Sequence, residues 1–445
     1  MNRFLWLVTA VAFGCGSSGG AADVDNDAGT GGDGDGGDGG DGGTAGTSSV
    51  TLTLTNRPMN ANMFSFVVAY QDGSSPWQLA PAPTGDVYTI PISAPSYGVA
   101  YMCIGSTTGN QSSQQRSVTS AHFAVGERTS VTLDVPPRCS DRMQGGVTLS
   151  GNISNRPIGG VLVVQFGGRS AFVGSQTGNF TMQVPTGTRD LIVTHAVPEG
   201  NGDFYVDEAV VIRDVAITAN AIHSIDFSTS ESTNFFTVDA SDAPTNARVV
   251  ASTTLYTANG TTTSLVREAQ NWEATALADV QKRPTDIYDL SIAVSTQGAG
   301  ATVTHATAAP ADQTYVAPAP LGDVATTVPT KMPYITLEST WPAYPAAIGY
   351  LWNATQTLSC SGSLTCSIVW TSFLSPGVVG TSPAYRMPDL AALAGWKDAF
   401  ELGTAPIVGS VTAVTSSAGG ADFPTGIPAA GTDRVFVRSD YGLTP

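Results

Sequence analysis

Four carboxylates lie close together in one short stretch of the chain, and their chemistry suits a metal ion. Glu199, Asp203 and Asp207 surround a Gly-Asn-Gly sequence, and Glu208 follows directly. Carboxylate oxygens crowded around a Gly-rich turn are the hard ligands that calcium prefers. The sequence therefore predicts a candidate calcium site at Glu199, Asp203 and Asp207, with a solvated acidic loop as the alternative. No other cofactor is expected.

Aromatic side chains form a second group with potential chemistry. Trp341, Tyr344, Tyr350 and Trp352 fall within twelve residues of one another. Tyr350 and Trp352 are two residues apart, so they share one face of a predicted strand. Two interpretations stay open for these rings. They pack in a core, or they form an exposed platform that stacks on a polysaccharide or another cell-surface ligand.

The sequence motifs of common hydrolases and transferases are absent. There is no Gly-x-Ser-x-Gly nucleophile turn, no His-Glu-x-x-His zinc motif and no Gly-Lys phosphate loop. Within 174–178 the glycines have the spacing of a nucleophile turn, but Gln176 stands at the position of the nucleophile. The sequence favours a protein that is not an enzyme. The alternative is an exported hydrolase, or an accessory subunit acting on polysaccharide, with its activity in 230–445.

The chain is acidic, which limits its partners. Its net charge is −17, and the part after residue 48 carries −11 with only three lysines. This sign disfavours nucleic acid and anionic lipid surfaces as partners. The acidic tract Asp33–Gly43 and the flanking Gly, Ser and Thr residues cannot bury apolar surface, so 16–48 is expected to be a disordered Gly/Asp-rich tether.

The segment before this tether resembles the N-terminus of a bacterial lipoprotein. Arg3 precedes the apolar run Phe4–Phe13, and Gly14-Cys15 ends it. The resemblance implies a signal peptide at 1–14, lipidation of Cys15 and attachment to the outer membrane, with the protein displayed at the cell surface. The alternative is an ordinary secretory signal cut after Ala12.

The other four cysteines are expected to form disulfides, because an even number in an exported chain favours pairing. Cys360 and Cys366 flank five residues that include Gly362, which predicts a hairpin bridged at its neck. Cys103 and Cys139 fall in one predicted module and are expected to pair there.

Strand patterns dominate the rest of the chain. Val50–Thr55 alternates apolar and polar residues, and short strands of this kind follow at regular spacing without helices between them. The pattern predicts an all-β fold of tandem antiparallel β-sandwich modules after the tether. The expected boundaries are 49–140, 141–229 and 230–445, and an Ala/Pro-rich segment near 308–330 divides the last region.

One helix is predicted, over Met387–Gly403. Pro388 and Asp389 suit a helix start, Leu390 and Leu393 have helical spacing, and Gly403 suits the end.

The first two modules share a short sequence. Asn56-Arg57-Pro58 recurs as Asn155-Arg156-Pro157, 99 residues later, and an apolar strand follows each copy. This spacing predicts a duplicated fold.

The second module also carries Gly178-Asn179-Phe180 and Val184-Pro185-Thr186-Gly187-Thr188. With these motifs, 143–228 resembles the carboxypeptidase-regulatory-like, transthyretin-like sandwich. The resemblance implies a module of about seven strands that serves as a spacer or binding domain and is not itself catalytic. Taken with the anchor, it predicts a non-enzymatic cell-envelope lipoprotein that displays its modules for binding or adhesion.

Overall fold

The computed structural model describes residues 48–107, 113–140, 146–173, 177–198, 204–267, 273–332, 334–360, 365–422 and 427–445. Cys15 and the tether up to residue 47 lie outside these ranges, and Ser48 begins the first strand. The described part is built almost wholly of strands, with one four-residue α-helix and short 3-10 turns, so the predicted all-β fold is confirmed. No helix in these ranges has both the length and the apolar character needed to cross a membrane.

The strands form four successive sets, which we call units 1 to 4. Unit 1 contains β1 (Ser48–Thr55), β2 (Val67–Asp72), β3 (Gln78–Leu79), β4 (Val87–Ile92), β5 (Ser96–Thr107), β6 (Ser113–Ala124) and β7 (Ser130–Asp134). Unit 2 contains β8 (Val147–Ser154), β9 (Val161–Phe166), β10 (Arg169–Phe172), β11 (Asn179–Val184), β12 (Gly187–Pro198), β13 (Phe204–Ile217) and β14 (Ala221–Asp226).

The remaining elements make up the C-terminal half. Unit 3 contains β15 (Glu231–Ser232), β16 (Asn234–Asp239), β17 (Arg248–Tyr256), β18 (Thr262–Arg267), β19 (Glu273–Ala276), β20 (Ile287–Thr296), β21 (Ala299–Thr307) and β22 (Gln313–Thr314). Unit 4 contains β23 (Ala325–Thr330), β24 (Thr336–Thr340), β25 (Gly349–Ser359), β26 (Thr365–Leu374), α1 (Pro376–Val379), β27 (Ala384–Arg386), β28 (Ile407–Ser416) and β29 (Asp433–Leu443).

Units 1, 2 and 3 share one topology in their three-stranded sheets. In β4-β1-β7 the central β1 is antiparallel to β4 and parallel to β7. The sheets β11-β8-β14 and β19-β16-β22 repeat this arrangement. In unit 4 the three-stranded sheet is β23-β24-β27. Here β23, which precedes β24 in the chain, is one outer strand, and both outer strands are antiparallel to the central β24.

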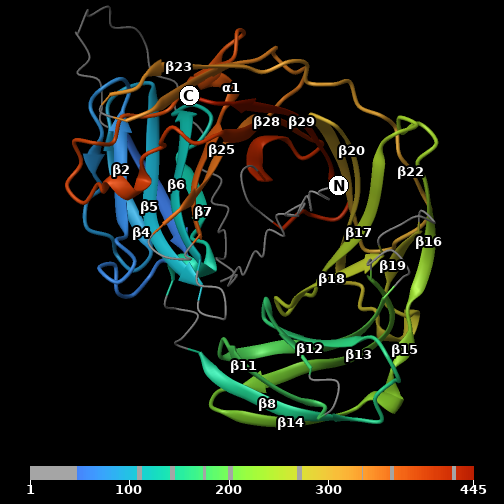
Figure 1. Cartoon of the computed structure of the whole chain (residues 1–445). Coiled ribbons are helices and arrows are strands. Elements are labelled where there is room, and N and C mark those ends of the chain that lie inside the picture. Colours follow the sequence, from blue (N-terminus) through green and yellow to red (C-terminus); the bar gives the residue numbers. More distant parts are fainter. Residues whose placement is uncertain are drawn as a thin grey trace, which may run out of the picture.

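The second sheets of the four units join into one continuous sheet. Strand β6 pairs with β26, β29 with β21, and β13 with β18. The units therefore follow the order 1, 4, 3, 2 along this sheet and form an arc (Figure 1). Most pairs are antiparallel as predicted, but the β6–β26 pair that connects units 1 and 4 is parallel. We call this junction the β6–β26 seam.

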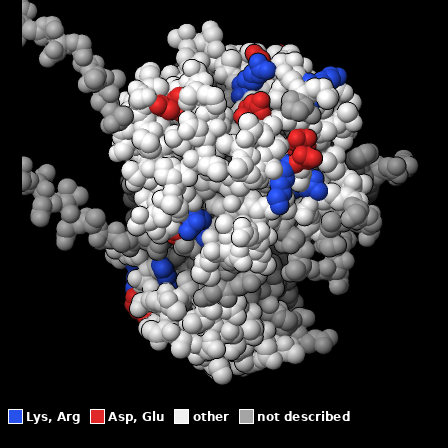
Figure 2. Space-filling view, turned by 90° about the vertical axis from the view of Figure 1, so that its left-hand side faces the viewer, with Lys and Arg blue, Asp and Glu red and all other residues white. Residues whose placement is uncertain are grey.

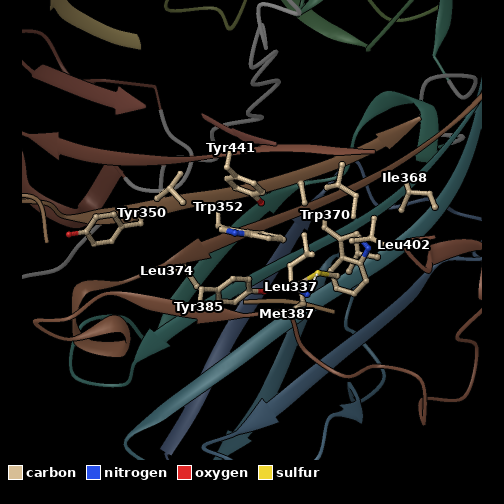
Figure 3. Packing of buried hydrophobic residues seen from close by; sticks show 14 of the residues in the cluster. Leu337, Tyr350, Trp352, Ile368, Trp370, Leu374, Tyr385, Met387, Leu402 and Tyr441 are labelled. Carbon is tan, nitrogen blue, oxygen red and sulfur yellow. Dashed lines mark hydrogen bonds between the residues drawn. The ribbon is translucent and has the colours of Figure 1, made fainter. Parts of the chain in front are cut away.

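Each unit encloses a core between its two sheets. The alternating residues Val50, Leu52 and Leu54 of β1 are fully buried, as their pattern predicts. The core of unit 4 is built around Trp352 and Trp370, which come from neighbouring strands (Figure 3). Side chains from the opposite face of the unit 1 sheet, namely Ala69, Met102 and Val118, join the same core. Units 1 and 4 are therefore packed together through apolar surface as well as through the seam.

The predicted helix at Met387–Gly403 is wrong. Its only helical residues are the 3-10 turn Asp398–Phe400. Gly395 adopts a φ of +95°, and a Cβ there would lie 2.7 Å from Val67 Cγ2. Leu390 and Leu393 enter the core of unit 4 from a loop. The two leucines are therefore spaced as in a helix, but they are buried from a loop that covers the core.

The repeated Asn-Arg-Pro sequence has one structural role in both units. Asn56 and Asn155 each follow the central strand with left-handed φ values of 58° and 50°. Asn56 Nδ2 donates to Asp134 Oδ1 at 2.8 Å, and Asn155 Nδ2 donates to Asp226 Oδ1 at 2.8 Å. Each aspartate ends the parallel outer strand. The same link thus closes the three-stranded sheet of both units, which supports the predicted duplication.

Candidate functional site

The four aromatic residues predicted as a ligand platform lie in or against the core of unit 4. Trp352, Tyr350 and Trp341 are 0%, 3% and 5% exposed, and Tyr344 is half-buried. Trp352 Nε1 donates to Ser339 Oγ at 2.9 Å. Figure 3 shows Tyr350 and Trp352 on the same strand as parts of the packed cluster. These rings form the core and do not present the open faces that stacking on a sugar requires.

Of the predicted calcium ligands, Glu199 and Asp203 lie outside the described residues, and Asp207 lies on β13. Asp207 Oδ1 is 2.8 Å from His195 Nδ1, and His195 Nε2 is 3.1 Å from Gly159 O. The Asp207 carboxylate is thus already hydrogen-bonded to the buried imidazole of His195. Within the part of the chain that the structure describes, no group of three or more His, Cys, Asp or Glu side chains is arranged to hold a metal ion.

A serine and a histidine meet at the β6–β26 seam. Ser120 Oγ lies 3.2 Å from His122 Nε2 and 2.8 Å from Ser372 Oγ, and Ser372 Oγ lies 2.5 Å from Tyr385 OH. Burial lowers the pKa of His122 to about 4, so its imidazole is neutral near pH 7. Both serines are 0% exposed. A substrate cannot reach these oxygens, and the cluster serves to satisfy polar groups inside the seam.

Buried ion pairs connect neighbouring units elsewhere in the sheet. Arg213 of unit 2 donates from Nη1 to Asp190 Oδ2 at 2.8 Å and from Nη2 to Asp286 Oδ2 of unit 3 at 2.6 Å. Arg434 of unit 4 donates to Asp289 of unit 3 at 2.5 Å. Asp286 and Asp289 are 0% and 8% exposed. These two carboxylates hold neighbouring units together.

Burial by itself raises the pKa of Asp190. Hydrogen bonds from the Asp214 N–H, the Asn259 amide and the Arg213 guanidinium outweigh this effect, so the pKa lies below its usual value of 3.8. The carboxylate is therefore charged at neutral pH and matches the cation beside it.

The structure contains both disulfides that the cysteine pattern predicts. Cys103–Cys139 joins β5 to the turn after β7, and both of its residues are fully buried. Cys360–Cys366 joins the chain after β25 to the start of β26. Each disulfide therefore connects segments within one unit.

A row of polar side chains crosses the surface of unit 4 that faces away from its core. Thr371 on β26, Asn353 on β25, Ser410 on β28 and Asp440 on β29 lie directly opposite one another in four adjacent strands. In the next row, Thr412 and Arg438 lie beside the apolar Leu351 and Phe373. We call this surface the inner face and define it by Asn353, Thr371, Ser410, Thr412, Arg438 and Asp440.

The three-stranded sheets of units 3 and 4 lie on the outer side of the arc (Figure 1). The inner face is on the opposite side of the unit 4 sheet, so it turns toward the middle of the arc. Arg438 Nε lies 2.8 Å from Asp440 Oδ1, and the Arg438 side chain is 49% exposed. Asn353 Nδ2 donates to Thr371 Oγ1 at 3.3 Å. The face thus combines hydroxyl, amide, carboxylate and guanidinium groups on one rigid sheet.

Sequence reasoning missed this face, since its residues are spread over almost ninety positions from Asn353 to Asp440. The available signal was the alternation of Ser, Thr and Asn with apolar residues along β25, β26 and β28. That pattern marks one polar side for each strand, but only the pairing of the strands brings the polar sides together.

The side of the molecule shown in Figure 2 is poor in charge. On the side shown in Figure 2, the few Lys and Arg side chains lie mostly next to Asp or Glu, and wide areas carry no charge. This side therefore shows no large patch of one sign, in keeping with a partner other than a polyanion.

No protein-family model matches the chain, and no curated protein matches it. Among solved structures, a protein described as a putative adhesin from Bacteroides ovatus covers 39% of this chain and 90% of its own, with 10% identity and a TM-score of 0.15. The FN1-FN3 domains of chicken CNTN1 cover 85% and 90%, with 9% identity and a TM-score of 0.16. The Bacillus anthracis TIE protein covers 60% of this chain and 49% of its own, with 10% identity and a TM-score of 0.14. At these TM-scores the likeness carries no argument about function.

Proposed function

We propose that this chain is a lipid-anchored protein of the bacterial cell envelope that binds a polysaccharide through its inner face. The single observation that carries the binding role is the alignment of polar groups from four adjacent strands on one side of the unit 4 sheet. The anchor on Cys15 and display at the cell surface rest on the sequence resemblance. The role is that of a binding protein, and it requires no catalytic residue.

The groups of the inner face suit a ligand that is rich in hydroxyls. Carboxylate and guanidinium groups form strong, directed hydrogen bonds, and the Asn353 amide offers a donor and an acceptor. Neighbouring strands lie about 4.8 Å apart, so the groups within one row repeat at a spacing suited to successive groups of an extended chain. Because the strands are fixed in one continuous sheet, binding needs little ordering of the protein.

The role of the inner face is tested by binding of purified 48–445 to immobilised bacterial polysaccharides. We expect the double variant Arg438→Ala, Asp440→Ala to bind at least about tenfold more weakly, a loss of roughly 1.4 kcal/mol. The matched control is Arg386→Ala, which removes an exposed arginine on β27, in the three-stranded sheet on the other side of unit 4. Equal binding by the double variant and the wild type would rule out the inner face.

The anchor is tested by membrane fractionation and protease treatment of intact cells. We expect the full chain to fractionate with membranes and to be cleaved from outside, and Cys15→Ala to be released. Recovery of both forms in the soluble fraction would show that Cys15 is not lipidated. Protection of a membrane-bound wild type would place the binding partner inside the envelope.

A further inference from the structure

The Cys360–Cys366 disulfide lies directly against a cation from another unit. Arg116 of β6 places Nη2 at 3.2 Å from Cys360 Sγ and at 3.6 Å from Cys366 Sγ. The same guanidinium donates from Nη1 to Ala399 O at 3.2 Å and from Nε to Gln114 Oε1 at 3.0 Å. Its position over the two sulfurs is therefore held by bonds on both sides of the β6–β26 seam.

The two cysteine residues differ in exposure. Cys366 is 0% exposed and lies opposite Gln114 in the seam ladder, whereas Cys360 is partly exposed. A thiolate from outside the protein therefore reaches Cys360 first. Attack on one sulfur of a disulfide expels the other as the leaving group, so Cys366 is the sulfur that leaves.

We propose that Cys360–Cys366 is an exchangeable disulfide, attacked at Cys360 by a dithiol reductant, with Cys366 leaving as a thiolate beside Arg116. The new bond joins the sulfur of the reductant to Cys360 Sγ. The Cys360–Cys366 bond breaks, and its electron pair goes to Cys366 Sγ. The second thiolate of the reductant then attacks the mixed disulfide and releases Cys360 as a thiolate, while the reductant is oxidised to its own disulfide. This role goes beyond the proposed binding function and does not depend on it.

Arg116 acts on the leaving group. A neighbouring arginine stabilises a thiolate over the neutral thiol, and a more stable leaving thiolate departs faster. The guanidinium lies within 3.6 Å of Cys366 Sγ before exchange begins, so the stabilising charge is already in place.

The second disulfide is an internal control in the same molecule. Cys103 and Cys139 are both 0% exposed, so an external thiolate reaches neither sulfur while unit 1 stays folded. The structure therefore assigns fast exchange to one disulfide and slow exchange to the other.

The test uses residues 48–445 with both disulfides formed. The protein is treated with dithiothreitol at neutral pH, quenched by alkylation at intervals and mapped by peptide mass spectrometry. We expect Cys360–Cys366 to be reduced at least about tenfold faster than Cys103–Cys139, because only the first contains a partly exposed cysteine. With glutathione, which has a single thiol, the mixed disulfide is expected on Cys360 and the alkylated thiol on Cys366.

Substitution of the cation tests its part in the step. Arg116→Gln is expected to slow reduction of Cys360–Cys366 by roughly 3- to 10-fold through loss of leaving-group stabilisation. Arg116→Lys, which keeps the charge, is expected to stay closer to the wild-type rate. Reduction of Cys103–Cys139 should remain slow in both variants, which shows that unit 1 is still folded.

Three results would overturn the proposal. They are equal reduction rates for the two disulfides, glutathione on Cys366 in place of Cys360, and an unchanged rate in Arg116→Gln. The first two use the wild-type protein, so they decide the question even if Arg116→Gln fails to fold. None of these measurements involves a polysaccharide. A result that overturns the disulfide proposal therefore does not affect the proposed binding role of the inner face.

Discussion

Gly409 is the residue that lets β28 pass beneath the ring of Tyr441. A Cβ at this position would lie 2.3 Å from Asn353 O and 2.3 Å from Tyr441 Cζ. Because Gly409 has no side chain, the Tyr441 ring lies directly over it, and the Tyr441 hydroxyl donates to Asn353 O at 2.8 Å. Asn353 belongs to the inner face, so this core contact helps to position a residue of the candidate binding surface.

Gly409→Ala should therefore destabilise the protein by about 2–3 kcal/mol, because the new methyl group displaces the Tyr441 ring from a packed site. Urea unfolding of 48–445 followed by fluorescence measures the change. The control is Gly442→Ala on the neighbouring β29, where the nearest atom to a new Cβ is Ile407 O at 4.0 Å. The control should stay within roughly 0.5 kcal/mol of wild type, and a similar loss in both variants would refute the steric explanation.

Asp190 is the carboxylate whose charge contributes to stability in a pH-dependent way. Its pKa in the folded protein lies below 3.8, so its contribution is complete above the unfolded pKa and is lost as the pH falls through the folded pKa. Asp190→Asn should cost about 3 kcal/mol near pH 7, since it removes one partner of the buried Arg213.

The difference between wild type and Asp190→Asn should shrink below about pH 4, where the wild-type carboxyl also becomes neutral. Unfolding free energies measured from pH 7 down to pH 2.5 give the profile. A difference that stays constant over this range would mean that the carboxylate charge is not what stabilises the junction of units 2 and 3.

The elements show what a sequence pattern can and cannot predict. Alternation in Val50–Thr55 predicts a strand with one buried side, because burial on one side of a sheet imposes a period of two. The same rule underlies the other strands and the all-β fold. The partner of a strand has no such local sign. Strand β6 pairs with β26, and Ser120 meets Ser372 across 252 residues, which no spacing within either segment indicates.

Tertiary contacts also changed the meaning of local patterns. The Leu390–Leu393 spacing suits a helix, but Gly395 takes a left-handed φ against Val67, and the segment remains a loop over the core. The aromatic residues Tyr350 and Trp352 share one face as predicted, but a three-stranded sheet covers that face. The inner face could not be predicted from the sequence for the same reason as the seam, because it forms only when four strands are paired.

The two disulfides should differ in what they add to stability. Their cysteines are separated by 36 and 6 residues, and a longer closed loop restricts the unfolded chain more strongly. The chain-entropy estimate predicts a loss of about 4 kcal/mol for Cys103→Ser, Cys139→Ser and about 2 kcal/mol for Cys360→Ser, Cys366→Ser. Urea unfolding of both double variants provides the comparison. Equal losses, or a larger loss from the shorter loop, would contradict this account.

At the scale of the whole molecule, the four units are sandwiches fused into one body. They share a continuous sheet, buried ion pairs join units 2 and 3 and units 3 and 4, and unit 1 inserts Val118 into the core of unit 4. Tandem modules on flexible linkers would lack these contacts. The inner face of unit 4 is therefore held by the neighbouring units on both sides.

We expect 48–445 to unfold in one cooperative transition in differential scanning calorimetry, with a calorimetric enthalpy equal to the van't Hoff value. Val118→Asp places a charge in the core shared by units 1 and 4. This variant should separate the melting of unit 1 from that of the rest. Several resolved transitions in the wild-type protein would show that the units are thermodynamically independent.

The order 1, 4, 3, 2 along the sheet has a consequence for the timing of synthesis. The ladder partner of β6 leaves the ribosome about 250 residues after β6 itself, and at about 5–20 residues per second this delay is roughly 12–50 s. During that time the growing chain carries a twelve-residue strand with one unpaired edge, a feature that promotes association between chains. The first five residues of β6 are Ser-Gln-Gln-Arg-Ser, and this polar start leaves little apolar surface for a second chain to bind before β26 is synthesised.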